Sequence, residues 1–125
     1  MTAPAHARSP KQELKMIVQR IVEAYAPEKI ILYGSYAYGT PGEHSDFDLL
    51  ILKETSEAPR DRWFAVNKAI WPLPTTIPAE PIVVTESELA HRLKIGDQFF
   101  QEIVNRGKTL YDRKRLADSR RMVRI

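Results

Sequence analysis

Residues 34–48 read GSYAYGTPGEHSDFD, which places a Gly-Ser turn ahead of two carboxylates that are one residue apart. The apolar run 49–52 follows, and such a run is typical of a buried strand. Residues two apart in a strand project to the same face, so Asp46 and Asp48 are expected to point at one spot. Carboxylate oxygens suit Mg²⁺, which also takes ligands from substrate phosphates. The segment therefore predicts a metal and phosphate site at the head of a strand.

Helix and strand patterns alternate on both sides of this segment. Ser9 and Gln12 form a capping box with Pro10 at the first helical position, so a helix is expected from there to Pro27. Strands are expected at 29–33, 46–53, 80–84 and 108–111, a short helix at 35–38, and longer helices at 60–71, 86–93 and 97–106. The prediction is an α/β (α+β) fold: a small mixed β-sheet of three to four strands flanked by helices.

Three details of these elements carry structural predictions. Pro81 indicates that strand 80–84 lies at an edge of the sheet or has the proline at its first residue. Gly107 is expected to close the preceding helix at the C′ position. The aromatic residues of the 60–71 pattern, Trp63, Phe64 and Trp71, are expected in the core rather than in a base-stacking platform.

Length and composition indicate one domain. The chain has 125 residues and no cysteine, which excludes disulfides and thiolate metal sites and fits a reducing cytoplasm. It contains no apolar stretch near the roughly 20 residues that cross a bilayer, and its start lacks the order of a signal peptide. We expect a disordered segment 1–8, a domain over 9–112 and a basic tail over 113–125, in a cytoplasmic protein with no membrane partner.

The net charge of +3 raises the question of a nucleic-acid partner. Much of the excess falls in the tail 113–125, which is read first as a solvated end of the chain. The alternative is a docking arm for an acidic partner, either a protein or RNA. Phosphate contacts alone give salt-sensitive, unspecific binding, so nucleic acid is not the partner we expect.

The spacing of the first motif resembles a known family. Gly34-Ser35, ten residues and then Asp46-Phe47-Asp48 is similar to the signature of minimal nucleotidyltransferases, within the DNA-polymerase-β-like superfamily. The resemblance runs from the first expected strand to Tyr111 and implies the polymerase-β-like fold. That family has a third carboxylate on a later strand, and Glu80 stands at the corresponding place. Here the sequence departs from the usual Asp, and a proline follows directly.

The resemblance implies a set of roles. Asp46 and Asp48 would bridge two Mg²⁺ ions, and Glu80 would ligate the ion that carries the acceptor hydroxyl and accept its proton. The Gly34-Ser35 turn would bind the β and γ phosphates of an NTP. Ser45 would steady the neighbouring Asp46 or contact phosphate. Glu80 could instead be a solvated acid at a strand edge, in which case nucleotide would bind without being turned over.

The resemblance also implies an acceptor. Larger transferases carry additional helical domains that bind the acceptor, and almost nothing follows Tyr111 here except the basic tail. Small members of this kind are often antitoxins that transfer AMP from ATP to a tyrosine of a helical toxin, an RNase, within a hetero- or homo-oligomer. The alternatives are an antitoxin that masks its partner without catalysis, and a transferase for a small molecule such as an aminoglycoside.

Overall fold

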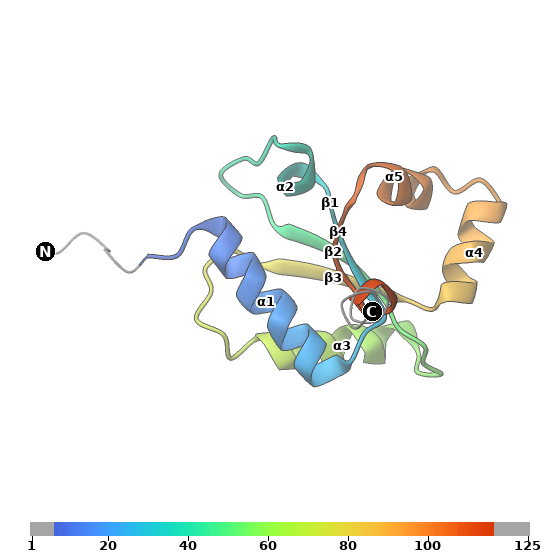
Figure 1. The fold of residues 1–125 in the computed structure, drawn as a ribbon, viewed down its shortest axis with the longest axis horizontal. Coiled ribbons are helices and arrows are strands. Elements are labelled where there is room, and N and C mark those ends of the chain that lie inside the picture. The colour runs from blue at the N-terminus through green and yellow to red at the C-terminus, as the bar shows by residue number, and fades with distance from the viewer. Residues whose placement is uncertain (1–6, 117–125) are drawn as a thin grey trace, which may run out of the picture.

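The computed structural model describes residues 7–116, in which four strands form one sheet in the order β3-β2-β1-β4 (Figure 1). The strands are β1 (Lys29–Tyr33), β2 (Phe47–Leu52), β3 (Ala79–Val84) and β4 (Lys108–Asp112). β1 is antiparallel to β2 and β4, whereas β2 and β3 run parallel. The mixed four-stranded sheet confirms the predicted fold class.

Helices pack around this sheet in the described part of the chain: α1 (Pro10–Tyr25), α2 (Ser35–Tyr38), α3 (Pro59–Ile70), α4 (Glu86–Lys94) and α5 (Gln98–Arg106). α1 and α3 lie on one side of the sheet, and α4 and α5 lie on the other (Figure 1). The predicted capping box opens α1, with both Ser9 and Gln12 bonded to the other's backbone amide. Within residues 7–116, none of the helices has the length and apolarity needed to span a bilayer.

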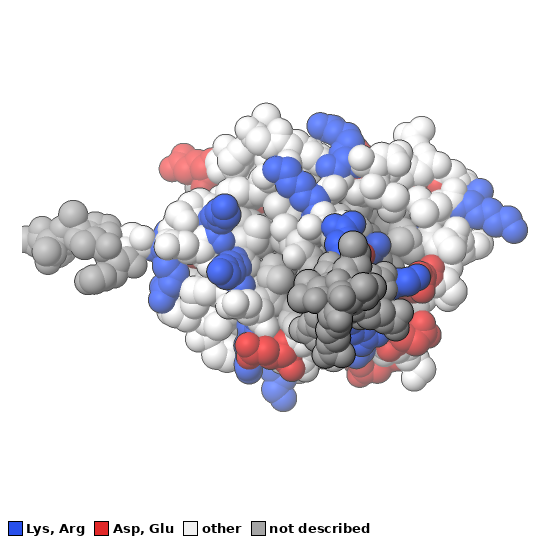
Figure 2. Space-filling model, in the orientation of Figure 1, with Lys and Arg blue, Asp and Glu red and all other residues white. Residues whose placement is uncertain are grey.

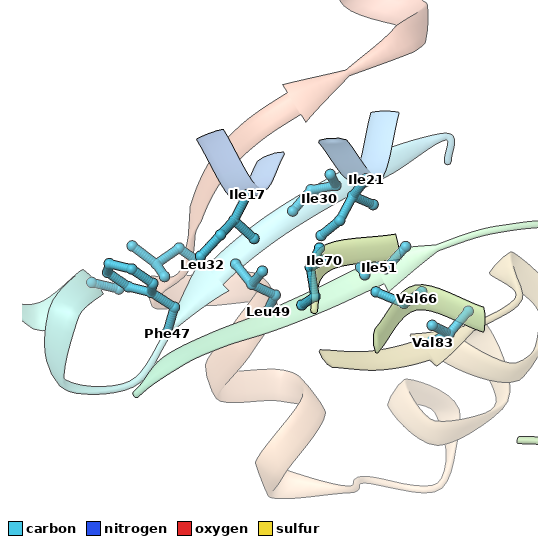
Figure 3. Packing of buried hydrophobic residues seen from close by; sticks show 11 residues of the cluster. Ile17, Ile21, Ile30, Leu32, Phe47, Leu49, Ile51, Val66, Ile70 and Val83 are labelled. Carbon is cyan, nitrogen blue, oxygen red and sulfur yellow. The ribbon is translucent and has the colours of Figure 1, made fainter. Parts of the chain in front are cut away.

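The alternation of side chains along β2 decides which residues reach the core. Phe47, Leu49 and Ile51 face α1 and α3, where they pack against buried residues of both helices: Ile17, Ile21, Val66 and Ile70 (Figure 3). Leu50 points the other way and packs with Ile31 of β1 and Ile103 of α5. Side chains two residues apart in a strand point to the same face, so Asp48, like Leu50, projects on the α4 and α5 side of the sheet.

β3 is an edge strand, as Pro81 predicted. The carbonyl oxygens of Pro78 and Val84 accept hydrogen bonds from the amides of Phe47 and Lys53, at 2.9 and 3.0 Å. The even-numbered residues of β3 therefore turn their backbone groups toward β2, and the odd-numbered residues turn theirs outward. Because Pro81 is odd-numbered, its missing N–H removes no hydrogen bond from the sheet.

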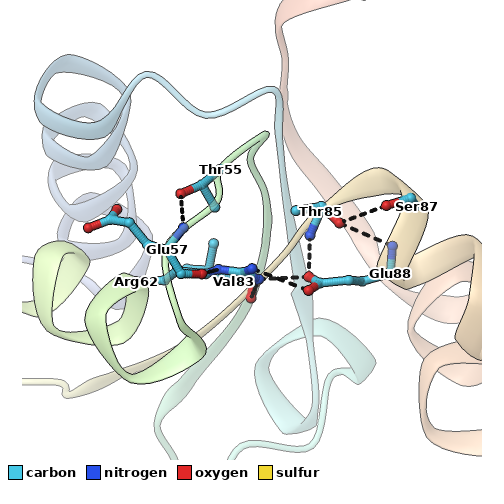
Figure 4. Close-up of polar contacts among 7 residues, drawn as sticks. All are labelled: Thr55, Glu57, Arg62, Val83, Thr85, Ser87 and Glu88. Atoms are coloured by element: carbon cyan, nitrogen blue, oxygen red, sulfur yellow. Dashed lines mark hydrogen bonds and ion pairs between the residues drawn. The ribbon is translucent and has the colours of Figure 1, made fainter.

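Arg62 of α3 covers part of this outer edge (Figure 4). Its buried guanidinium donates to the carbonyl of Val83 at 3.3 Å and forms two hydrogen bonds with the carboxylate of Glu88, at 2.6 and 3.2 Å. The bonds from Arg62 and from the Thr85 amide hold the pKa of Glu88 at about 2. This network ties α3, β3 and the first turn of α4 together.

The prediction that Trp63, Phe64 and Trp71 lie in the core is wrong. These side chains are 42%, 51% and 58% exposed. α3 faces the sheet through Val66 and Ile70, and Phe64 falls on the outer side of the helix. Trp63 has the helical spacing of the inner face, but its ring lies at the rim and lines a cavity. Trp71 follows the last helical residue and packs edge-on against both other rings.

Gly107 ends α5, but not in the left-handed conformation that a C′ glycine usually adopts. Its φ is −66°, an ordinary value for any residue. A Cβ atom there would lie 2.6 Å from Cγ2 of Ile31 and would overlap the carbonyl oxygen of Ile103. Glycine is therefore needed because α5 and β1 approach each other closely, and backbone strain plays no part.

Of the predicted basic tail, residues 113–116 begin a helical turn and are exposed, while 117–125 lie outside the described residues. The predicted disordered start overlaps residues 1–6, which also lie outside them. On the face drawn in Figure 2, Lys and Arg side chains are scattered among acidic and neutral ones, without a continuous basic stripe.

Candidate active site

The sheet brings two of the predicted carboxylates side by side. In the parallel register of β2 and β3, Asp48 stands opposite Glu80. Tyr33 stands opposite Asp48 on its other side, in the antiparallel register of β1 and β2. Register partners project on the same face, so Tyr33, Asp48 and Glu80 form one row across three strands. Asp46 immediately precedes β2 and adds a third carboxylate at the end of this row.

Two groups of this row, Asp48 and Tyr33, have raised pKa values. Burial raises the pKa of Asp48, and the negative charges of Asp46 and Glu80 raise it further. Burial together with the charges of Asp48, Glu80 and Tyr38 raises the pKa of the Tyr33 phenol to about 12. Three carboxylates at the end of the sheet thus repel one another, and a bound cation would relieve that repulsion.

The Gly-Ser turn lies directly against Asp48. Gly34 has a φ of +77°, and a Cβ atom added there would overlap Oδ2 of Asp48. The carbonyl oxygen of Gly34 accepts from the amides of Ala37 and Tyr38, both at 3.0 Å, which opens α2. The first amides of a helix have no acceptor within it, so those that begin at Ser35 are available beside the carboxylates.

Ser45 organises the loop that leads to Asp46. Its hydroxyl accepts from the amide of Gly42 at 2.7 Å, and its own amide donates to the carbonyl of Gly42 at 3.2 Å. A cavity of about 300 Å³ opens here, with Tyr36, Ser45 and Asp46 in its wall. His44 also lines it and is exposed, as expected of a loop histidine.

One residue that positions this region was missed from the sequence. Glu13 of α1 is only 3% exposed and accepts three hydrogen bonds of 2.9 Å, two from Thr76 and one from the amide of Ile77. Although burial raises its pKa, these hydrogen bonds hold the pKa below its ordinary value. Glu13 thereby anchors the link that leads into β3 and Glu80. The sequence did contain a signal of this burial, because Glu13 stands four residues before Ile17 and so falls on the buried face of α1.

The donor set suits Mg²⁺ in chemistry, because it consists of carboxylate oxygens on one face beside a turn that can bind phosphate. As the side chains stand in residues 7–116, no three His, Cys, Asp or Glu lie close enough together to hold one metal ion. Glu80 is exposed, and no hydrogen bond fixes its side chain within that range.

Comparison with known proteins assigns this geometry to a family. Residues 15–116 match the family described as Polymerase beta, Nucleotidyltransferase. The chain belongs to this nucleotidyltransferase family. The predicted resemblance and the enzyme class are thereby confirmed. No curated protein matches this nucleotidyltransferase.

Solved structures share its fold. A protein from Sulfolobus solfataricus assigned as a nucleotidyltransferase is 18% identical, with a TM-score of 0.56, and the match covers 82% of this chain and 79% of that one. A mutant of the toxin–antitoxin MntA-HpeT is 21% identical, with a TM-score of 0.53 and coverages of 82% and 74%. A toxin–antitoxin structure with AMP-PNP is 21% identical, with a TM-score of 0.55 and coverages of 82% and 75%.

Proposed function

We propose that this nucleotidyltransferase uses Mg²⁺ to transfer AMP from ATP to a tyrosine hydroxyl of a helical toxin and acts as the antitoxin of that partner in the cytoplasm. The observation that carries the proposal is the placement of Asp48 between Glu80 and the Gly34 turn. Similarity to toxin–antitoxin structures, one of them with AMP-PNP, supports the choice of partner and nucleotide.

In this proposal the three carboxylates would hold the metal ions. Asp46 and Asp48 would contact both ions. The exposed side chain of Glu80 would turn toward Asp48 and add a ligand to the ion that carries the acceptor hydroxyl. Two bound Mg²⁺ ions would supply charge neutralisation for the attacking and leaving oxygens. Glu80 would then take the proton from the acceptor hydroxyl.

The turn and the loop would hold the triphosphate. The amides that begin at Ser35 would donate to phosphate oxygens, at the positive end of α2. Gly34 would permit the close approach, because its backbone already lies in contact with Asp48. Ser45 would keep the loop before Asp46 in place through its bonds to Gly42, and its hydroxyl could still donate to phosphate.

Exposed aromatic side chains line a cavity beside β3, on the α1 and α3 side of the sheet. A cavity of about 360 Å³ is lined by Trp63 and Trp71 and reaches Glu80. The side chain of Glu80 projects on the opposite side of the sheet, together with Asp48, so this cavity is separate from the carboxylate row. This exposed aromatic surface favours a second function, in which the chain masks its partner by binding alone.

Glu80→Gln separates these two functions. We expect the variant to bind MgATP within about threefold of the wild type, because Asp46, Asp48 and the turn remain. Its rate of transfer should fall by roughly 1000-fold, because the base and one ligand of the acceptor side are lost. The measurement is the transfer of labelled AMP from ATP to the partner, followed over time.

Glu86→Gln is the matched control, since Glu86 is exposed in the first turn of α4 and lies outside the row of carboxylates. It should transfer at the wild-type rate. Wild-type transfer by Glu80→Gln would contradict the catalytic role. Neutralisation of the partner without transfer, by wild type and variant alike, would favour masking, and label on an aminoglycoside alone would favour the small-molecule alternative.

A further inference from the structure

We propose that Arg106 binds the β and γ phosphates of the nucleotide and stabilises the departing pyrophosphate. This inference rests on the nucleotide site of the proposed function and adds to it a residue from α5, an element that the site motifs do not include. Arg106 is the last residue of α5 and precedes Gly107 and β4.

The close approach of the end of α5 to β1 brings Arg106 near the phosphate-binding turn. β1 and β4 are antiparallel, with Ile31 opposite Thr109 and Leu32 opposite Lys108. Arg106 ends α5 two residues before Lys108, so its backbone lies near the C-terminal end of β1, which Gly34 follows. The backbone is still close to β1 at Gly107, where an added Cβ would lie 3.1 Å from the carbonyl oxygen of Leu32.

The guanidinium group is also held against α2. Its central carbon lies 4.0 Å from the centroid of the Tyr38 ring, in a cation–π contact. The Tyr38 amide donates to the carbonyl of Gly34 at 3.0 Å, so this ring belongs to the single helical turn that follows the glycine. Two observations, the close approach of Gly107 to β1 and the stacking of Arg106 on Tyr38, thus place Arg106 near the turn.

The donors of Arg106 remain accessible in this position. The side chain is 58% exposed, and its Nη1 forms one hydrogen bond of 2.9 Å with Glu102, an exposed partner on the same helix. A guanidinium carries five N–H donors in a planar fork that matches phosphate oxygens. An exposed ion pair of this kind contributes little stability, so a triphosphate can compete for it.

At this end of the sheet, the charge of the side chains changes from negative on β3 and β2 to positive before β4. Glu80 on β3 and Asp48 on β2 are acidic, Gly34 follows β1, and Arg106 precedes β4. The carboxylates suit the metal-bound α phosphate, whereas the β and γ phosphates need a cation on the other side of the turn. Arg106 supplies that cation, so the triphosphate would lie across the turn from β2 toward β4.

The position also suits the reaction step. The acceptor oxygen forms a bond to the α phosphorus, and the bond from that phosphorus to the bridging oxygen of the β phosphate breaks. The electron pair leaves with pyrophosphate, and the hydroxyl proton passes to Glu80. Negative charge therefore grows on the β phosphate, where a fixed guanidinium favours the transition state.

The test compares the affinities of ATP and AMP, measured by calorimetry with Mg²⁺. Arg106→Gln should weaken ATP binding by about tenfold and leave AMP binding unchanged, because AMP lacks the β and γ phosphates. Arg106→Lys should recover part of the ATP affinity. Glu102→Gln is the matched control: it removes the same ion pair but keeps the guanidinium, and should bind ATP at least as well as the wild type.

Two results would overturn this role: unchanged ATP affinity in Arg106→Gln, or an equal loss of ATP and AMP affinity. The affinity for ATP is measured without an acceptor, so this test does not depend on what the acceptor is. If the wild type binds ATP with the predicted Arg106 dependence but labels no partner, the acceptor assignment fails and the role of Arg106 stands. If the wild type binds no ATP, both fail.

Discussion

Asp48→Asn is expected to abolish nucleotidyl transfer, with a loss of roughly 1000-fold or more. Asp48 stands at the centre of the row, opposite Glu80 on one side and Tyr33 on the other, and in contact with the Gly34 turn. No neighbouring carboxylate can take over that place. The measurement is the rate of AMP transfer to the partner, at saturating ATP and Mg²⁺.

The same variant should remain folded. The pKa of Asp48 is raised in the folded chain, by burial and by the charges of Asp46 and Glu80. A carboxyl whose pKa is higher in the folded state favours folding most when protonated, so ionised Asp48 lowers stability at neutral pH. Asparagine removes this charge, and the melting temperature should be equal to or above that of the wild type.

Asp61→Asn provides the matched control, because Asp61 is an exposed acid in the first turn of α3. It should keep full activity. Retained transfer in Asp48→Asn would remove this residue from the site. A lower melting temperature would show that Asp48 acts through the fold, in contradiction to its raised pKa.

Gly34→Ala has the second largest expected effect. Gly34 has a φ of +77° and a ψ of −163°, a region that residues with a side chain rarely enter, and its Cβ would overlap Oδ2 of Asp48. We expect a loss of about 1 to 3 kcal/mol in the free energy of unfolding. Transfer should fall by roughly 100-fold, because Asp48 and the turn can no longer hold their relative positions.

Gly39→Ala is the control for Gly34→Ala, because it adds backbone strain without a contact to Asp48. Gly39 also has a positive φ, +81°, but a Cβ there would meet no atom within 4 Å. It should lose stability and keep most of its activity. Urea unfolding and transfer rates, measured for both variants, make the comparison. Equal activity in the two variants would contradict a site built on the contact of Gly34 with Asp48.

The sequence predicted the elements that depend on local patterns. The capping box of Ser9 fixed the start of α1, and the outward position of Pro81 matched an edge strand. The spacing from Gly34 to Asp48 was sufficient to indicate the family. In each case the deciding interaction lies within a few residues or follows from the two-residue period of a strand.

The features that the sequence did not predict depend on contacts between distant parts of the chain. The bonds of Glu13 to Thr76 span 63 residues, and the stacking of Arg106 on Tyr38 depends on how the fold places α5 beside α2. Such pairings follow from tertiary packing, which no periodicity reveals. Trp63 was misplaced because a helical pattern predicts the inner face of α3 but not that this ring lies at the rim of an open cavity.

The central claim is that the chain modifies a partner protein with AMP at the site of Asp46, Asp48 and Glu80. Intact-mass spectrometry of the proposed toxin partner, after incubation with the chain, ATP and Mg²⁺, tests it most directly. The expected result is a mass gain of one or more AMP groups on tyrosine, absent with EDTA and absent with Asp48→Asn. A partner that is neutralised while its mass stays unchanged would contradict the claim.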